Sequence, residues 1–488
     1  MKNVFDVIVV GAGPGGSSAA TFLSRQGIPT LVVDKAIFPR EKVCGDGLTP
    51  QAIYWLDILG CVDEVLDRAD SCITSGDIFV NGGHVLTGQF PQNSSYPGFS
   101  VLLERKILDH ILLRNAISHG AQFRPNCRVE KLSRVRDGIL VEARMGQENV
   151  VLKGKIVIGA DGANSTISRL IGNTLRDGTT AVSVRAYYEK VAAEKSHIQL
   201  HFDDQFFPGY GWVFVDDNGK ANIGVGYAFD RNFKLRKSLR KAFDEFVSND
   251  LKKVLKHAKP AAPPAGGWAS FYRPKTLVGP GVMLIGDAAN MTDPLNGGGI
   301  HMAMESAYAA SGVAAQAIET GDCSIEFLRQ YETLWEEKTE IDRRTGELIL
   351  SIAKNPHLRE IYLLLIKAVV RLIRSDPRFE EFCGGLFCGT IPTRLCLSPF
   401  VLLNVIPFNP LSWISFPPLS GGRSLRTLLE QAYSGLTSII KTTGRVAGNP
   451  FENLIWGADI VSQALGLAKC YTDQRPEVPS PSSPYPYH

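Results

Sequence analysis

The distribution of hydrophobic and polar residues predicts a strand–helix–strand unit at the start of the chain. Residues 4–10 form a short β-branched run, residues 17–26 have helical composition, and residues 30–34 form a second β-branched run that ends in an acid. Asp6 interrupts the first run, which leads into a glycine cluster and not into a cleavage site. The run is therefore interpreted as a buried strand and not as a signal peptide.

Further elements are expected in the first 160 residues. The pattern predicts a helix over 53–69 and a Gly/Pro/Ser-rich region of short strands and turns from 75 to 100. Residues 104–120 place apolar side chains at helical spacing and stop at a glycine, which predicts another helix. Strands are expected at 127–132, 138–145 and 155–159.

From about residue 176 to 274 the pattern changes to β-like segments with interleaved aromatic residues, which predicts a second domain. A basic helical segment is expected within it at 231–257. Its first part, RNFKLRKSLRKAF (231–243), is interpreted as a solvated helix face, with attraction to a membrane surface as the alternative. At 282–285 the strand–helix pattern returns, followed by a small-residue helix at 300–320. Amphipathic helices are expected at 324–354, 356–374 and 424–441.

Composition and charge exclude several classes of protein. The chain of 488 residues is 44% hydrophobic and 21% charged, with 52 Lys and Arg against 49 Asp and Glu, which is typical of a globular protein and not of a nucleic-acid reader. The nine cysteines are scattered without a CxxC pair, so neither a disulfide framework nor a zinc site is indicated, and no metal site is predicted. A reducing, cytoplasmic compartment is expected.

The first glycine cluster predicts a dinucleotide-binding turn. Gly11, Gly13 and Gly16 form GxGxxG between a strand and a helix, and Asp34 ends the next strand. The glycines allow a tight turn and close approach to a pyrophosphate at the helix N-terminus, while Asp34 can accept hydrogen bonds from ribose hydroxyls. An acid at position 34 disfavours a 2′-phosphate, so NAD or FAD is preferred over NADP.

Two further loops favour FAD over NAD. Asp161 and Gly162 end a buried strand, and Gly286 and Asp287 end another before a second glycine run. A simple NAD dehydrogenase needs neither loop, whereas a long extended cofactor needs several. With these three motifs in order, the chain resembles the FAD-dependent class that includes aromatic hydroxylases, squalene epoxidases and geranylgeranyl reductases.

The segment DKAIFPREKVCGDGLTP, residues 34–50, resembles the corresponding segment of the geranylgeranyl reductase family, which includes menaquinone side-chain reductases. The resemblance implies that Arg40 contacts the flavin region and that Cys44 faces the isoalloxazine, although a small buried hydrophobe is the alternative for Cys44. It also implies an FAD-contacting role for Arg105 and a backbone contact of Val129 with adenine. The full set of cofactor-binding residues expected from the motifs and the resemblance is Gly11, Ala12, Gly13, Pro14, Gly15, Gly16, Asp34, Lys35, Arg40, Gly45, Asp46, Arg105, Val129, Asp161, Gly162, Gly286, Asp287, Pro294, Gly297, Gly298, Gly299 and Ile300.

The inserted domain carries a second family signal. The run Gly209–Phe214 followed by Gly224 and Gly226 resembles the reductase signature Y/F-x-W-x-F-P with a later G-x-G. Period 2 places its three aromatic residues on one face of a strand, a wall suited to an isoprenoid chain, with core packing as the alternative. The predicted substrate residues are Tyr210, Trp212, Phe214, Gly224 and Gly226.

Three departures from family patterns bear on function. Val215 stands where the reductases have proline. The third loop reads Asp293-Pro294-Leu295-Asn296-Gly297-Gly298-Gly299, with glycine where the reductases have an acid, which resembles squalene epoxidases. The Gly-Glu-Ser and second Trp of halogenases are absent, which disfavours that class. His301 follows the loop and is expected to cap or pack, with a titrating role as the alternative.

The expected fold is α/β, with a Rossmann-type FAD-binding domain, an inserted mainly β substrate domain and a helical C-terminal region. The FAD-binding domain is expected in three parts, 1–75, 101–175 and 275–330. The substrate domain is expected to comprise 76–100 and 176–274. Residues 331–475 are expected to form the C-terminal region, and 476–488 a disordered tail.

The resemblance implies a reductase that saturates alkene bonds of a lipophilic, isoprenoid-like substrate with hydride from N5 of reduced FAD. NAD(P)H or ferredoxin is the expected electron donor. The alternative is a flavin monooxygenase that epoxidises or hydroxylates a lipophilic substrate through a C4a-hydroperoxide, and a flavin-dependent halogenase is less favoured. Cys44 is expected near the flavin without an assigned step. No nucleic-acid partner is expected.

One stretch points to a membrane surface. Residues 395–422 contain no charged residue, yet four of their five prolines, Pro399, Pro407, Pro410 and Pro417, would break a spanning helix. The helix expected at 356–374 is basic at both ends and apolar between. Because a lipophilic substrate must enter from the bilayer, a peripheral, monotopic attachment is the preferred interpretation.

Overall fold

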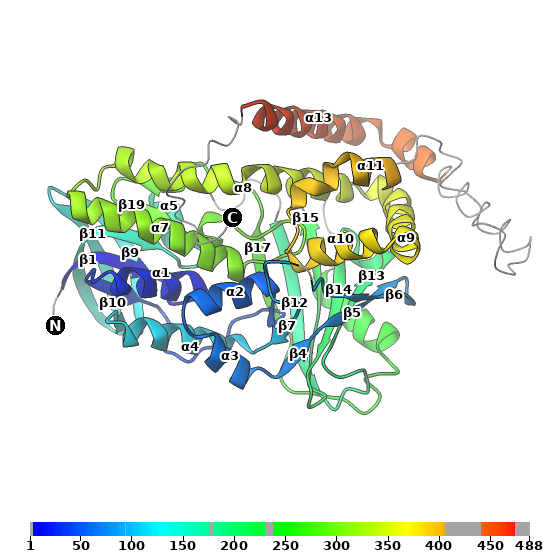
Figure 1. Ribbon diagram of the computed structural model, residues 1–488, viewed down its shortest axis with the longest axis horizontal. Helices are drawn as coiled ribbons and strands as arrows, with labels where there is room; N and C mark the ends of the chain where they lie inside the picture. The colour runs from blue at the N-terminus through cyan, green and yellow to red at the C-terminus, as the bar shows by residue number, and fades with distance from the viewer. Residues whose placement is uncertain (1–2, 93, 175–179, 230–237, 406–440, 474–488) are drawn as a thin grey trace, which may run out of the picture.

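The computed structural model describes residues 3–92, 94–174, 180–229, 238–405 and 441–473. It is a mixed α/β structure in which helices cover a first sheet and a second sheet lies beside it (Figure 1). The expected fold class is confirmed, whereas the domain boundaries drawn from the sequence stay a prediction.

The first sheet is built around parallel strands. Its order is β18 (Val278–Gly279), β19 (Val282–Leu284), β11 (Glu148–Gly159), β1 (Val4–Val10), β2 (Thr30–Val33) and β8 (Gln122–Arg124), with β10 (Gly138–Met145) and β9 (Cys127–Val135) attached to β11. β1 pairs in parallel with both β2 and β11. Strands from three distant parts of the sequence therefore meet at the centre of this sheet.

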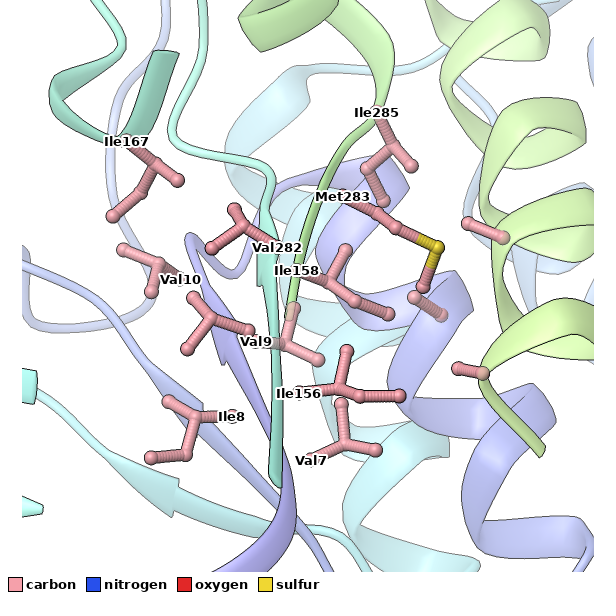
Figure 2. Close-up of a cluster of buried hydrophobic side chains, with 14 of the residues drawn as sticks. Val7, Ile8, Val9, Val10, Ile156, Ile158, Ile167, Val282, Met283 and Ile285 are labelled. Carbon is pink, nitrogen blue, oxygen red and sulfur yellow. The ribbon is translucent and has the colours of Figure 1, made fainter. Parts of the chain in front are cut away.

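The core of the first sheet follows from its β-branched strands. Val7, Ile8, Val9 and Val10 of β1 are all buried, so both faces of the strand are covered, as is usual for parallel sheets. Figure 2 shows them with side chains of β11 and β19. The helices packed here are α1 (Pro14–Arg25), α4 (Arg105–Ser118), α7 (Ile300–Thr320) and α8 (Ile325–Ala353).

The second sheet is mostly antiparallel. Its order is β16 (Lys259–Pro260), β12 (Thr180–Glu189), β15 (Ala221–Phe229), β14 (Gly209–Val215), β13 (His197–Phe202), β5 (Ser75–Val80) and β6 (Gly83–Gln89), with β17 (Ala265–Ser270) on β12. β5 and β6 come from the N-terminal third of the chain and join strands more than 100 residues later. α6 (Leu239–Glu245) packs on β12 and β15. A small third sheet contains β3 (Gly47–Leu48), β7 (Ser100–Leu102) and β4 (Ser71–Ile73).

The remaining helices begin or end at glycine or proline in most cases. Residues 53–69, predicted as one helix, form α2 (Pro50–Ile58) and α3 (Val62–Arg68), because Gly60 between them has a φ of 66°. α5 (Thr166–Leu170) is a single turn. The C-terminal helices are α9 (Arg359–Ser375), α10 (Pro377–Cys388), α11 (Pro399–Val405) and α13 (Pro450–Asp473). Four of the predicted segments reach beyond the described residues. Outside them lie residues 231–237 of the segment 231–257, residues 406–422 of the segment 395–422, residues 424–440 of the segment 424–441 and the whole tail 476–488.

Trp212 makes Gly224 a packing requirement of the second sheet. The two residues are cross-strand partners on β14 and β15, and a Cβ atom at position 224 would overlap the indole ring. We expect Gly224→Ala to lower the free energy of unfolding by about 1–3 kcal/mol, because the buried ring must move. Urea denaturation with FAD present measures this loss.

Gly88→Ala is the matched control for that substitution. Gly88 also lies within a strand of the second sheet, and a Cβ atom there would meet nothing within 4 Å. Equal stability of the two variants would contradict the packing role of Gly224.

Candidate active site

The turn between β1 and α1 contains two kinds of glycine: those whose position has no room for a side chain and one whose position has room. Gly11 has a φ of 106°, and a Cβ atom on it would collide with the Ala160 carbonyl, while one on Gly16 would collide with the Gly11 carbonyl. Gly13 has only the end of the Arg40 side chain nearby, at 3.5 Å. Gly11 and Gly16 are thus required by packing, whereas Gly13 leaves open space in front of the N-terminus of α1, where a phosphate fits.

Asp34 connects the end of β2 to this turn. Its two carboxylate oxygens accept backbone hydrogen bonds of 2.8 Å from Ala12 and Ala36. The side chain is largely buried and lines the same cavity as Gly13. Each oxygen has a second lone pair, so Asp34 can also accept hydrogen bonds from a ribose, and this role stays a prediction.

The two other acids that follow strands, Asp161 and Asp287, accept hydrogen bonds from different groups than Asp34 does. The carboxylate of Asp161 accepts hydrogen bonds from the Thr166 amide at 2.6 Å and from the hydroxyl of Ser165, the N-cap residue of α5, at 2.5 Å. Burial raises the pKa of Asp161, against the effect of these hydrogen bonds. Asp287 follows β19 and accepts a hydrogen bond of 3.0 Å from the Thr292 hydroxyl. Both acids line the cavity.

A buried arginine and a partly buried one give one part of the cavity a positive charge. Arg105 donates two hydrogen bonds, of 2.8 and 3.0 Å, to the carboxylate of Asp109, and Arg40 Nη2 lies 3.1 Å from the same group. Burial lowers the pKa of Arg105, but Asp109 and the adjacent Cys44 raise it more, so the guanidinium stays charged. Two cations share one anion, which leaves a net positive charge.

Arg40 Nη1 is buried and has no hydrogen-bond partner within the described ranges. Arg40 also lines the cavity beside Gly13. An unsatisfied guanidinium nitrogen, open space at Gly13 and a helix N-terminus together fit the anionic pyrophosphate of FAD. The residues present therefore fit the predicted cofactor.

The segment Cys44–Gly47 is held by the second sheet. Asp46 has a φ of 64°, and its carboxylate accepts hydrogen bonds from the Tyr187 hydroxyl and, at 2.7 Å, from Asn222 Nδ2. The same amide donates to the Cys44 carbonyl at 2.8 Å, and Asn222 Oδ1 accepts from Trp212 Nε1 at 3.0 Å. Burial raises the pKa of Asp46, while its hydrogen bonds and nearby arginines oppose the rise. The predicted cofactor loop and the predicted substrate wall thus share one network.

The aromatic residues of β14 lie on one face of the strand. Tyr210, Trp212 and Phe214 line the cavity, whereas Val213 and Val215 are buried in the core on the other face. Valine at position 215, where the family has proline, therefore continues the strand without disturbing the wall. Gly224 does not line the cavity but lies under the Trp212 ring. Gly226 does line the cavity, and a Cβ atom on it would lie 3.7 Å from that ring.

The departure in the third glycine loop has a packing cause. A Cβ atom on Gly298 would lie 2.6 Å from His301 Cε1 and 2.8 Å from Asn296 Oδ1. His301 is buried beside the loop, and burial lowers its pKa to about 4, so it is neutral near pH 7. A side chain at position 298 is incompatible with this position of His301.

One cavity of about 910 Å³ brings these groups together. All predicted site residues line it except Ala12, Gly16 and Gly224, and their individual roles stay predictions. Beyond the aromatic wall the cavity extends along apolar side chains that the sequence did not single out: Ile198, Leu200, Tyr227, Ile349, Tyr362 and Phe387. Tyr362 is partly buried, and this burial raises its pKa to about 12.

Comparison with known proteins agrees with this geometry. A family model described as an FAD binding domain matches residues 4–336, which is more than half of the chain. The cofactor prediction of FAD is therefore confirmed, whereas no comparison identifies an electron donor.

Two relatives and one solved structure are similar over most of the chain. Digeranylgeranylglycerophospholipid reductase 1 of Methanopyrus kandleri is 31% identical, covering 78% of this chain and 100% of the relative. Menaquinone reductase of Mycolicibacterium smegmatis is 32% identical, covering 85% and 95%. The structure of a geranylgeranyl bacteriochlorophyll reductase-like protein from Thermoplasma acidophilum has a TM-score of 0.66 at 22% identity, covers 89% of this chain and 100% of its own, and shows the shared fold.

The three glycine loops around one cavity, the FAD-binding family model and the full-length reductase relatives agree with the resemblance seen in the sequence. The chain belongs to the geranylgeranyl reductase and menaquinone reductase family of FAD-dependent oxidoreductases.

Proposed function

We propose that the protein reduces carbon–carbon double bonds in the isoprenoid chain of a lipid. The observation that carries this proposal is the position of Tyr210, Trp212 and Phe214 in the same cavity as the FAD-binding loops. The relatives named for digeranylgeranyl lipids and for menaquinone support an isoprenoid chain as the substrate class.

The chain's own residues would hold the substrate and exclude water. When bound, reduced FAD supplies a hydride from N5. The β14 aromatic wall offers ring faces to an alkyl chain, and the apolar end of the cavity gives that chain apolar surroundings. Tyr362 of α9 contacts Phe207, with ring centroids 5.1 Å apart, so α9 is packed at this end of the cavity.

Cys44 stays a residue without an assigned step. Its carbonyl is fixed by Asn222, and its side chain lies beside the Arg105 guanidinium, so the segment is rigidly positioned at the cavity wall. For the electron donor we propose NAD(P)H or ferredoxin acting transiently.

Turnover without oxygen tests the proposed reduction against oxygenation. We expect photoreduced enzyme, mixed with a polyprenyl lipid under strict anoxia, to give product with two added hydrogens per saturated bond, measured by mass spectrometry. The hydride comes from the cofactor and no oxygen atom is needed. A reaction that begins only after O₂ is admitted, with product heavier by one oxygen, would instead establish the monooxygenase alternative.

The aromatic wall makes a second prediction. We expect Tyr210→Ser to reduce kcat/KM for a long polyprenyl substrate roughly 5–30-fold, because about 1–2 kcal/mol of apolar contact is lost, while FAD content is unchanged. Tyr188→Ser is the matched control, since Tyr188 is a half-buried tyrosine of the same sheet that does not line the cavity. Equal losses in both variants would remove the assignment of the wall to substrate binding.

We also propose that the protein contacts a membrane surface peripherally. Within the described ranges every helix is too short or too polar to span a bilayer. α13 packs on α8 through one face, where Trp456 Nε1 donates to the Ser351 carbonyl at 2.9 Å and Leu467 is buried (Figure 1). Its other face exposes four apolar side chains at helical spacing: Phe451 (73%), Leu454 (71%), Val461 (58%) and Leu465 (67%).

Vesicle binding tests this surface. We expect the double variant Leu454→Gln and Leu465→Gln to bind phosphatidylcholine–phosphatidylglycerol vesicles at least about tenfold more weakly than the unaltered protein in a sedimentation assay. Ile117→Gln with Leu170→Gln removes two apolar side chains exposed elsewhere and should leave binding unchanged. Undiminished binding of the α13 variant would refute attachment through this face.

A further inference from the structure

The face of the second sheet that points away from the cavity carries three side chains of metal-binding type. Asp77 lies on β5, His197 begins β13, and Glu194 lies in the connection just before β13. One ligand atom from each lies within 4.8 Å of the other two. Ile198, the next residue along β13, lines the cavity, so His197 projects from the opposite face of the sheet. The group is therefore separated from the FAD site by the sheet itself.

Two residues of β6 fix the orientation of Asp77. Its Oδ1 atom accepts a hydrogen bond of 2.6 Å from the Thr87 hydroxyl and lies 3.0 Å from His84 Nε2. Its Oδ2 atom lies 2.9 Å from His197 Nε2. In metal sites, the surrounding residues often form hydrogen bonds to one oxygen of a carboxylate ligand, and the other oxygen then points at the metal. Asp77 has this arrangement.

His197 is buried with one nitrogen unsatisfied. The side chain is 2% exposed, and its Nε2 atom lies at an ion-pair distance of 2.9 Å from Asp77 Oδ2 without a well-aligned hydrogen bond to any described residue. Buried polar atoms are nearly always satisfied, so an orphaned imidazole nitrogen aimed into an acidic group needs a partner. A metal ion between the imidazole and the two carboxylates supplies one.

The three groups are close enough together to bind a small cation after small movements of their side chains. Two atoms each about 2.1 Å from one metal ion are about 3.4 Å apart in a tetrahedral site and at most about 4.2 Å apart. The observed separation of Asp77 Oδ2 and His197 Nε2 is 2.9 Å, so these two atoms must move about 0.5 Å apart to bind one tetrahedral ion. Glu194 is exposed, and its ligand atom lies within 4.8 Å of the other two. Its carboxylate can therefore approach by the remaining distance, up to about 1.4 Å, without repacking the core.

We propose that Asp77, Glu194 and His197 bind a divalent first-row transition-metal ion of the Zn²⁺ class. The imidazole ligand favours such an ion over Mg²⁺ or Ca²⁺, which prefer oxygen ligands only. The exposed side of the site leaves a fourth position for water. Bound metal would tie the β12–β13 connection to β5, a structural role that does not depend on the proposed function.

Zinc binding to the full-length, FAD-loaded protein tests the proposal. After removal of metals with a chelator, equilibrium dialysis against Zn²⁺ followed by elemental analysis should give one zinc per chain. We expect His197→Gln to weaken binding at least about tenfold and Zn²⁺ to raise the Tm of the unaltered protein but not of the variant.

Glu194→Gln keeps the test decisive if the buried His197 variant fails to fold. Glu194 is exposed, so its substitution should leave the fold intact while weakening zinc binding. His119→Gln alters an exposed histidine of another region and should bind like the unaltered protein. Absence of stoichiometric zinc, or equal zinc binding by the Glu194 and His119 variants, would overturn the proposal.

Discussion

The site depends on one buried carboxylate that joins the cofactor loop to the second sheet. Asp46 belongs to the segment after β2, yet it accepts hydrogen bonds from Tyr187 of β12 and Asn222 of β15. Removing one partner of a buried charge typically costs more than the pair contributes, because the remaining charge is left unpaired. The relative position of loop and sheet is therefore set by polar groups that must all be present together.

The same network determines where the aromatic wall stands. Asn222 uses its amide nitrogen for Asp46 and the Cys44 carbonyl, and its amide oxygen for Trp212. Gly45 lies against this wall, since a Cβ atom on it would come within 3.2 Å of the Phe214 ring. The single side chain of Asn222 thus connects the cofactor side of the cavity to its substrate side.

The sequence predicted those parts of the site that are written as local patterns. The strand β1 and the helix α7 were placed at their exact residues, because β-branched runs, glycine stops and small-residue helices are local signals. The alternation of Tyr210, Trp212 and Phe214 was equally visible. The single helix predicted over 53–69 was wrong because Gly60 acts there as a helix stop.

The sequence did not predict the hydrogen bonds and ion pairs of the site that join residues far apart in the chain. Tyr187 and Asn222 stand in ordinary strands, and their partner Asp46 is 141 and 176 residues away. Asp109, which holds two arginines, lies within a helix where an acid has no distinctive spacing. The family motifs identified Asp46 and Arg105 but not the groups that neutralise or orient them.

The discontinuous strand order has a consequence for how the protein is made. β1 pairs with β11, and β11 with β19, so the first sheet is incomplete until residue 284 has been synthesised. Likewise, β5 can pair with β13 only after about 120 more residues have been synthesised. Pairings of this kind fold slowly and expose strand edges meanwhile. The glycine turn that begins the cofactor site is synthesised first. The cavity around it can be completed only after more than half of the chain has been synthesised.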